Sequence, residues 1–185
     1  MRILLLCGSP RKDGNSSAMA DAFTYGAKDA SHTVVRFETA YINVNSCIGC
    51  RNCWADGRRC VLPADDMDKI YAEFEQCEAI VFASPVYWYS FTAQLKTVMD
   101  RFEPYTGSPE GRQRSKIRYC ALLGCAEAES HEIFTGMLFG YRGMAQYLGW
   151  KDCGSVVVPN VCQKGEILNT NGLDHAYTLG LNIGK

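Results

Sequence analysis

The stretch LCGSPRKDGNSS, residues 6–17, follows an apolar run that begins at Ile3 and precedes an amphipathic run that ends near Ala30. An apolar run, a loop bounded by Gly8 and Gly14, and an amphipathic run are typical of a strand, a loop and a helix. The first backbone N–H groups of a helix have no partner within it, so such a loop can hold an anion. The polar side chains that converge on this point are those of Ser9, Asn15, Ser16 and Ser17. The stretch therefore predicts an α/β fold whose first loop holds a phosphate.

Two motifs that are absent from the loop limit which phosphate-containing ligand it can bind. A Walker loop needs a lysine directly after its second glycine, where this chain has Asn15, and there is no G-x-G-x-x-G pattern. Neutral donors and a helix dipole suffice for a monoester phosphate such as that of FMN, whereas ATP would also need a magnesium site that the sequence does not offer. The alternative is an ordinary helix start, because serine and asparagine are common N-cap residues.

Length and composition predict a single domain over residues 1–185 of a cytoplasmic protein. Lys+Arg 19 against Asp+Glu 20 leave a formal net charge of -1, so neither a nucleic-acid partner nor a membrane surface is expected. The apolar run from Ile3 to Cys7 is too short for a signal peptide, and no stretch approaches the length of a membrane span. Ten cysteines are many for a compartment that keeps thiols reduced, so their grouping matters more than their number.

Strand and helix patterns alternate along the whole chain. Each predicted strand is a short apolar or β-branched run, and each predicted helix has apolar residues at a spacing of three or four. The segment from Glu103 to Ser115, rich in Gly and Pro, is predicted to be a loop. The predicted strands are Arg2–Cys7, Thr33–Phe37, Ala79–Ala83, Ile117–Leu123 and Ser155–Val158, and the predicted helices are Ser16–Ala30, one that starts after Asp65-Asp66, one from Ser90 to Phe102, Glu132–Leu148 and Asn171–Asn182.

This alternation is typical of a parallel sheet with helices on both faces. We expect a flavodoxin-like three-layer sandwich of five strands in the order 2-1-3-4-5, in which ligands bind where strands 1 and 3 meet, beyond their carboxyl ends. A cysteine-rich insertion without clear periodicity, at about residues 45–64, interrupts the pattern. A segment of that length without regular structure is usually functional or mobile.

The loop after the third strand should lie beside the first loop, because strands 1 and 3 are neighbours in this order. It reads Ser84-Pro85-Val86-Tyr87-Trp88-Tyr89-Ser90. Adjacent aromatic residues at a loop tip suit a planar heterocycle, although they would also suit a core edge or a subunit contact. Two loops that converge on one crevice favour FMN.

The motifs GSPR at 8–11, GNS at 14–16 and SPVYW at 84–88, with Lys96 and Asp100-Arg101, resemble those of the NADPH-dependent FMN reductase and iron–sulfur flavoprotein group. The resemblance spans nearly the whole chain. It implies that Ala126 and Glu127, in the Gly124–Ser130 loop, complete a cofactor pocket, although Cys125-Ala126-Glu127 is not the glycine-rich form that such relatives often show. It also implies that the FMN phosphate is surrounded by Ser9, Arg11, Asn15, Ser16 and Ser17, and that the isoalloxazine ring lies along Pro85, Val86, Tyr87 and Trp88.

Three charged residues of this resemblance lie on the third predicted helix. Taken by themselves, Lys96, Asp100 and Arg101 are interpreted as a solvated or paired face of that helix.

The cysteine segment has the pattern C-x2-C-x2-C-x6-C, formed by Cys47, Cys50, Cys53 and Cys60. Three closely spaced thiolates with a fourth nearby can bind a [4Fe–4S] cluster, whereas structural zinc sites usually pair two knuckles across a longer gap. The resemblance implies such a cluster here, but reduced thiols, a disulfide and zinc stay open as alternatives. The pKa values of these thiols are expected to be lowered by Arg51, Arg58 and Arg59.

The resemblance implies an FMN-dependent NAD(P)H oxidoreductase that passes a hydride from the nicotinamide to FMN and then to a quinone, a flavin or a similar small acceptor. No catalytic side chain is expected, because the chemistry belongs to the flavin, and the backbone N–H groups of Pro85–Tyr89 are expected to stabilise its reduced form. Two alternatives stay open. One is an electron carrier that relays electrons through the cluster and FMN with a ferredoxin-like partner, and the other is a non-catalytic flavin-binding redox sensor.

A homodimer or homotetramer is expected from the resemblance. Trp54, Tyr89 and Tyr105 are aromatic residues in predicted loops that would suit either an interface or local packing.

Overall fold

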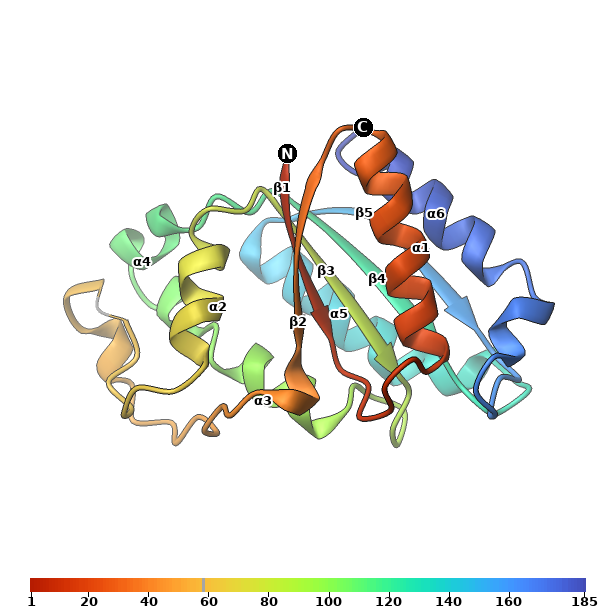
Figure 1. Ribbon diagram of the computed structural model, residues 1–185. Helices are drawn as coiled ribbons and strands as arrows, with labels where there is room; N and C mark the ends of the chain where they lie inside the picture. Colours follow the sequence, from red (N-terminus) through yellow and green to blue (C-terminus); the bar gives the residue numbers. More distant parts are fainter. Residues whose placement is uncertain (58) are drawn as a thin grey trace.

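A parallel sheet forms the centre of the molecule in the computed structural model, which describes residues 1–57 and 59–185. Its strands lie in the order β2-β1-β3-β4-β5, and every neighbouring pair is parallel. The predicted flavodoxin-like order is therefore confirmed (Figure 1). The strands are β1 (Arg2–Cys7), β2 (Thr33–Glu38), β3 (Ala79–Pro85), β4 (Tyr119–Cys125) and β5 (Lys151–Val158).

Helices cover both faces of the sheet because side chains alternate between the faces along each buried strand. Ile3 and Leu5 of β1 point into one core, which α1 and α6 cover side by side, and Leu4 and Leu6 point into the other, which α2, α3 and α5 cover. The helices are α1 (Asn15–Asp29), α2 (Met67–Phe74), α3 (Ala93–Asp100), α4 (Pro109–Arg114), α5 (Thr135–Leu148) and α6 (Gly172–Asn182). Short 3-10 helices are η1 (Thr39–Tyr41), η2 (Asn52–Gly57), η3 (Glu103–Tyr105), η4 (His131–Phe134) and η5 (Glu166–Asn169).

The predicted loop from Glu103 to Ser115 is wrong in part, since it contains η3 and α4. Ser108 caps α4 by accepting a hydrogen bond from the N–H of Gly111 at 3.0 Å, and Pro109 occupies the first helical turn. Proline is favoured at that position because its fixed φ suits a helix start and its missing N–H is not needed there. The Ser-Pro pair thus starts a helix that the Gly and Pro content had hidden.

Several boundaries differ from the sequence-based expectation, and the starts of β5 and α3 illustrate why. β5 begins at Lys151 and not at Ser155, because this edge strand tolerates the exposed polar residues at its start. α3 begins at Ala93 and not at Ser90, because Thr92 accepts a hydrogen bond from the N–H of Leu95 at 3.4 Å and so caps the helix.

Among the described residues, no helix is both long enough and apolar enough to cross a membrane.

Candidate functional site

The first loop ends at a helix start that no side chain caps. α1 begins after Gly14, and Ala18 is the first residue whose N–H donates back to the start of the helix, to the Gly14 carbonyl at 3.0 Å. The N–H groups of Asn15, Ser16 and Ser17 therefore have no partner within the helix, which makes this helix start suitable for a phosphate. At α1, a fully described helix, the alternative of a side-chain N-cap is thus excluded.

The amide of Asn15 fastens α1 to the segment that follows β5. Its Nδ2 donates to the Gln163 carbonyl at 2.9 Å and to the Val161 carbonyl at 3.4 Å, and its Oδ1 accepts from the N–H of Gly165 at 3.0 Å. Because both ends of the amide are used by the protein itself, what Asn15 offers to a phosphate is its backbone N–H. This differs from the side-chain role expected from the sequence.

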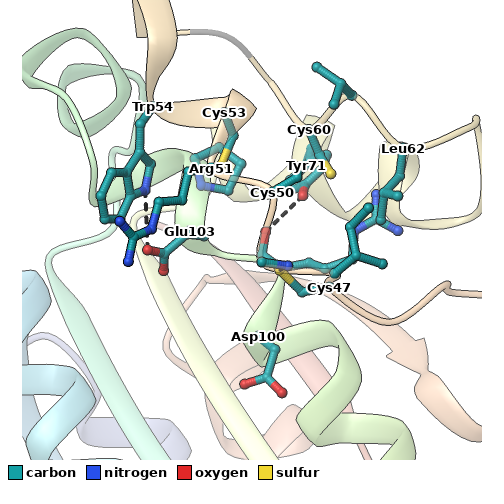
Figure 2. A pocket seen from close by; sticks show the side chains of 15 residues that line it. Cys47, Cys50, Arg51, Cys53, Trp54, Cys60, Leu62, Tyr71, Asp100 and Glu103 are labelled. Atoms are coloured by element: carbon teal, nitrogen blue, oxygen red, sulfur yellow. Dashed lines mark hydrogen bonds between the residues drawn. The ribbon is translucent and has the colours of Figure 1, made fainter.

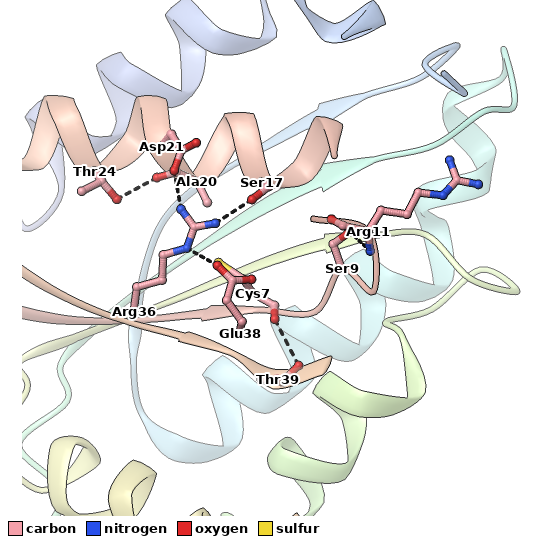
Figure 3. A network of polar contacts seen from close by, with 10 residues as sticks. All are labelled: Cys7, Ser9, Arg11, Ser17, Ala20, Asp21, Thr24, Arg36, Glu38 and Thr39. Atoms are coloured by element: carbon pink, nitrogen blue, oxygen red, sulfur yellow. Dashed lines mark hydrogen bonds and ion pairs between the residues drawn. The ribbon is translucent and has the colours of Figure 1, made fainter. Parts of the chain in front are cut away.

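The hydroxyl of Ser17 also bonds within the protein, away from the cavity described below. It accepts a hydrogen bond from Nη2 of Arg36 at 2.7 Å, and the same guanidinium pairs with Asp21 and with Glu38 (Figure 3). Ser9 forms a tight turn in which its hydroxyl accepts from the N–H of Arg11 at 3.1 Å. Of the five residues expected around the phosphate, four line the cavity, namely Ser9, Arg11, Asn15 and Ser16.

The loop after β3 closes as a tight hairpin. Tyr87 and Ser90 exchange two backbone hydrogen bonds of 2.9 and 3.0 Å, and the two residues between them, Trp88 and Tyr89, both have positive φ, at 48° and 62°. This places Trp88, which is 95% exposed, at the tip. The N–H of Val86 donates to the Cys125 carbonyl, and that of Tyr87 belongs to the hairpin, so neither is the free donor that was expected for a reduced flavin.

The loops after β4 and after β5 complete the crevice beyond the carboxyl ends of the strands. Ala126 donates its N–H to the carbonyl of Val158, which holds the loop after β4 against the end of β5. Both Ala126 and Glu127 line the crevice, as expected. Sequence reasoning missed the segment from Val161 to Lys164, although it follows a parallel strand and should therefore end at the same edge of the sheet.

These loops enclose one cavity of about 510 Å³. Its walls combine the open start of α1 and the cations Arg11 and Lys164 with apolar residues such as Pro85 and Val86. A phosphate fits the first kind of wall and a planar ring the second, so the residues present fit FMN. The sequence-predicted residues that line it are Ser9, Arg11, Asn15, Ser16, Pro85, Val86, Tyr87, Trp88, Ala126 and Glu127.

The thiols near the FMN cavity are held in the protonated form. Burial raises the pKa of Cys125 to about 12, and a hydrogen bond to Glu127, at 3.4 Å, raises the pKa of Cys162. These two thiols are therefore poor nucleophiles near neutral pH.

A second cavity, of about 280 Å³, lies in the cysteine segment (Figure 2). All four predicted ligands, Cys47, Cys50, Cys53 and Cys60, line it. The ten cysteines, all of them described residues, are free, so the thiols are not paired in a disulfide. Among the described residues no three His, Cys, Asp or Glu side chains lie close enough together to hold a single metal ion. Zinc, with Zn–S distances of about 2.3 Å, would need such a tight group, whereas a four-iron cube is larger and needs its thiolates further apart.

Two arginines of the segment, Arg51 and Arg59, contact groups other than the thiols. The guanidinium carbon of Arg51 lies 5.3 Å from the centre of the Trp54 ring, and Arg59 pairs with Glu75 at 2.6 Å. Burial and the neighbouring thiol of Cys60 raise the pKa of Cys53, which contradicts the predicted lowering. Arg58 lies outside the described residues.

The wall of this cavity also contains Arg101, which is only 2% exposed. Its Nη1 pairs with Asp65 and donates to the Asn45 carbonyl at 3.3 Å, and its guanidinium carbon lies 5.8 Å from the centre of the Tyr71 ring. Burial alone lowers the pKa of Arg101, but its interactions with Tyr71, with the hydrogen-bonded carboxylate of Asp65 and with Cys60 outweigh this and raise it. Arg101 is therefore a buried and paired residue, whereas Lys96 and Asp100 form the exposed pair that was expected, at 2.5 Å.

Of the three loop aromatic residues considered for an interface, Trp54 and Tyr105 pack against neighbouring residues and Tyr89 is largely exposed. Tyr105 is 1% exposed and stacks on Phe74, and the indole of Trp54 lies against Gly107 and donates to Glu103 at 3.1 Å. Both pack locally, so among the three residues only Tyr89 is left largely free for an interface.

Comparison with known proteins follows this geometry. A model of the family described as NADPH-dependent FMN reductase matches residues 1–133. An iron–sulfur flavoprotein from Archaeoglobus fulgidus is 39% identical over 129 residues, which are 69% of this chain and 58% of that protein. An iron–sulfur flavoprotein from Methanocaldococcus jannaschii is 32% identical over 100% of this chain and 96% of that protein. The chain thus spans little more than half the length of the first relative and nearly all of the second.

Among solved structures, an NAD(P)H:quinone oxidoreductase from Methanothermobacter marburgensis superposes with a TM-score of 0.77. It is 20% identical, and the match covers 98% of this chain and 95% of that one. At this identity the likeness shows the fold alone.

Proposed function

The chain belongs to the NADPH-dependent FMN reductase family, and from that premise we propose that it oxidises NADH or NADPH on bound FMN and passes the electrons to a small acceptor. Membership confirms the sequence-based assignment to the FMN-dependent, nicotinamide-linked oxidoreductases. The proposal treats residues 1–185 as one flavodoxin-like domain that carries the cysteine segment as an insertion, and it places the protein in the cytoplasm. The ten free cysteines suit a compartment that keeps thiols reduced.

The proposal rests on one observation, which is that the first loop and the loop after β3 line the same cavity. The N–H groups at the start of α1, with Ser16 and Arg11, would hold the phosphate, and Pro85, Val86 and the hairpin would lie along the ring. When bound, FMN supplies the hydride acceptor and donor that the chain itself lacks. The protein side would bind, orient and shield the ring, and the exposed hairpin would border the face on which the nicotinamide and the acceptor alternate.

The acceptor is proposed as a class only. The cavity walls next to the hairpin are apolar and aromatic, which suits a planar, conjugated molecule such as a quinone or a flavin.

The test is steady-state oxidation of NADH and NADPH by protein saturated with FMN, with menadione as acceptor. Substantial turnover that follows ping-pong kinetics is expected. Negligible turnover with both nicotinamides, from protein that retains its FMN, would contradict the proposal and leave the non-catalytic redox sensor as the better reading.

A second candidate function is an electron carrier, and the cavity lined by four cysteines favours it. Two relatives named iron–sulfur flavoprotein support the same reading. Here Cys47, Cys50, Cys53 and Cys60 would bind a [4Fe–4S] cluster that exchanges single electrons with a ferredoxin-like protein. The test is an absorbance spectrum with iron and sulfide analysis on protein prepared without oxygen. Cys50→Ser should lose the cluster and the transfer while FMN stays bound, whereas Cys153→Ser, outside the cavity, should change neither.

A homodimer or homotetramer remains part of the proposal. Trp88 and Tyr89 are exposed aromatic residues beside the FMN cavity, and they would be available to such an interface. Sedimentation equilibrium of the wild-type protein and of Trp88→Ala tests it.

A further inference from the structure

The buried Arg101 has a buried hydrogen-bond donor, Nε, without a partner among the described residues. Nη1, in contrast, is occupied by Asp65 and by the Asn45 carbonyl. A buried N–H without a partner costs stability, because the protein cannot replace the water that it loses. Native proteins leave few such groups, so each one calls for a ligand or another reason.

The polar groups around Arg101 have hydrogen-bond partners, in contrast to its Nε. Asp65 accepts from the N–H groups of Asn45 and Met67, at 2.8 and 2.9 Å, in addition to its pair with Arg101. The carbonyl of Arg101 accepts from the hydroxyl of Tyr71 at 2.7 Å. Tyr71 thus holds the backbone of Arg101, and Asp65 and the Asn45 carbonyl hold its guanidinium.

Arg101 lines the cavity formed by the four cysteines. Tyr71 lines the same cavity (Figure 2). The acceptors that line this cavity include the sulfur atoms of its four cysteines, to which a bound cluster would add its own sulfurs. Hydrogen bonds to those sulfurs are among the factors that set the potential of an iron–sulfur cluster, because they stabilise the negative charge added on reduction.

We propose that Nε–H of Arg101 donates a hydrogen bond to the sulfur shell held by the four cysteines and thereby raises the reduction potential of the cluster. The inference rests on the cluster that the second candidate function contains. In this proposal Arg101 adjusts the potential of the cluster and takes no part in the transfer of the electron itself.

Arg101→Lys isolates this donor. Along the side chain, Cε of lysine replaces Nε of arginine, so the variant exchanges the N–H for a methylene group and keeps a positive charge that can pair with Asp65. Arg36→Lys is the matched control, because it makes the same change at an arginine that lines neither cavity. Each protein is reduced with dithionite in an EPR-monitored titration after iron and sulfide analysis. We expect Arg101→Lys to shift the reduction equilibrium at least tenfold, which is 59 mV lower for a one-electron couple, and Arg36→Lys to match the wild type.

A second measurement uses the wild-type protein, so it does not depend on whether the variant binds a cluster. Wild-type protein containing arginine labelled with ¹⁵N at Nε is reduced, and electron spin echo modulation reports nitrogen coupled to the cluster. A ¹⁵N coupling supports the proposal. Its absence, or a wild-type potential in fully loaded Arg101→Lys, overturns the proposal while leaving the cluster intact. Wild-type protein without iron and sulfide would instead overturn the cluster itself, so the two failures are distinguishable.

Discussion

Asn15, Ser16 and Ser17 at the start of α1 have different roles, although all three were expected from the sequence to surround the FMN phosphate. The amide of Asn15 bonds the segment after β5, the hydroxyl of Ser17 bonds Arg36, and Ser16 alone combines a buried hydroxyl with a place in the cavity wall. Position on the helix decides this, because successive side chains point about 100° apart around its axis.

Alanine at each of these positions should therefore have a different effect. Asn15→Ala should lower the free energy of unfolding by about 1–3 kcal/mol, since it leaves the Gly165 N–H and the Gln163 carbonyl without their partner. Ser16→Ala should weaken FMN binding about tenfold, or by about 1.4 kcal/mol, with little change in stability. Urea denaturation and fluorescence titration of FMN measure the two quantities.

Ser17→Ala serves as the control, because its hydroxyl does not line the cavity. Its FMN affinity should equal that of the wild type. An affinity loss as large as that of Ser16→Ala would contradict this division of roles.

At the scale of elements, the hairpin after β3 is strained. A two-residue turn with positive φ at both central positions suits Asn-Gly, but here these positions hold Trp88 and Tyr89. The turn is held by α5, because a Cβ at Gly136 would come within 2.5 Å of the Tyr89 carbonyl oxygen. Strain that persists at a cavity wall is commonly connected with function.

The double variant Trp88→Asn, Tyr89→Gly should raise the free energy of unfolding by about 1–2 kcal/mol by relieving both residues. It should also weaken binding of FMN or of a planar acceptor, because the aromatic wall is lost. Thermal unfolding and FMN titration measure the two effects. Trp88→Phe keeps both the ring and the backbone strain, so it should change neither; equal stability of the double variant and the wild type would refute the strain.

The cysteine segment closes at a neck formed by Asn43 and Asn45 on one side and Asp65 and Asp66 on the other. Burial alone raises the pKa of Asp65, but the N–H groups of Asn45 and Met67 and the Arg101 guanidinium outweigh it and hold that pKa below its usual value. A lowered carboxyl pKa contributes stability above the unfolded value of about 3.9, and this contribution is lost as the pH falls through the folded-state pKa.

Stability should therefore fall below about pH 4 in the wild type, and this part of the fall should disappear in Asp65→Asn. At pH 7 that variant should be about 3–5 kcal/mol less stable, because Arg101 is left buried without its partner. Urea midpoints between pH 7 and pH 3 measure both. Asp68→Asn, an exposed neighbour on α2, should behave as the wild type.

At the scale of the whole molecule, the layer on one face of the sheet depends on close contact between α1 and α6. A Cβ added at Gly26 would lie 2.0 Å from the Tyr177 carbonyl oxygen, and one added at Gly180 would lie 2.2 Å from that of Phe23. Both contacts are with backbone, so the helices would have to move apart. At Gly140, on α5, an added Cβ would meet nothing within 4 Å.

Gly26→Ala should therefore cost about 1–3 kcal/mol or more in the free energy of unfolding, by overpacking. Gly140→Ala should instead gain about 0.5–1 kcal/mol, because alanine is the better helix former in an open position. Urea denaturation of the two variants beside the wild type is the measurement. A gain in Gly26→Ala would show that the two helices are not in direct contact.

The fold was largely predictable because its signals are local and repeated. Strand and helix periods follow from which faces are buried, and the alternation indicates a parallel sheet. The order 2-1-3-4-5 is that of the flavodoxin-like winding expected for it. The misplaced element, α4, depends on one Ser-Pro cap, and the early start of β5 depends on its being an edge strand, a fact of the assembled sheet. The candidate FMN residues of the first loop and of the loop after β3 could be predicted, because the strand order brings these two loops together.

By itself, the sequence determined the alternation of strands and helices, the two loops rich in polar and aromatic residues and the grouping of the four cysteines, since each depends on short stretches of chain. Only the tertiary structure decided what single side chains do. Asn15 is taken up by the segment after β5, and Arg101 is buried beside the cysteines with no partner for Nε in the described part of the chain, because hydrogen-bond partners come from residues far away in the chain. Burial and partnership are properties of the packed molecule, and no local pattern carries them.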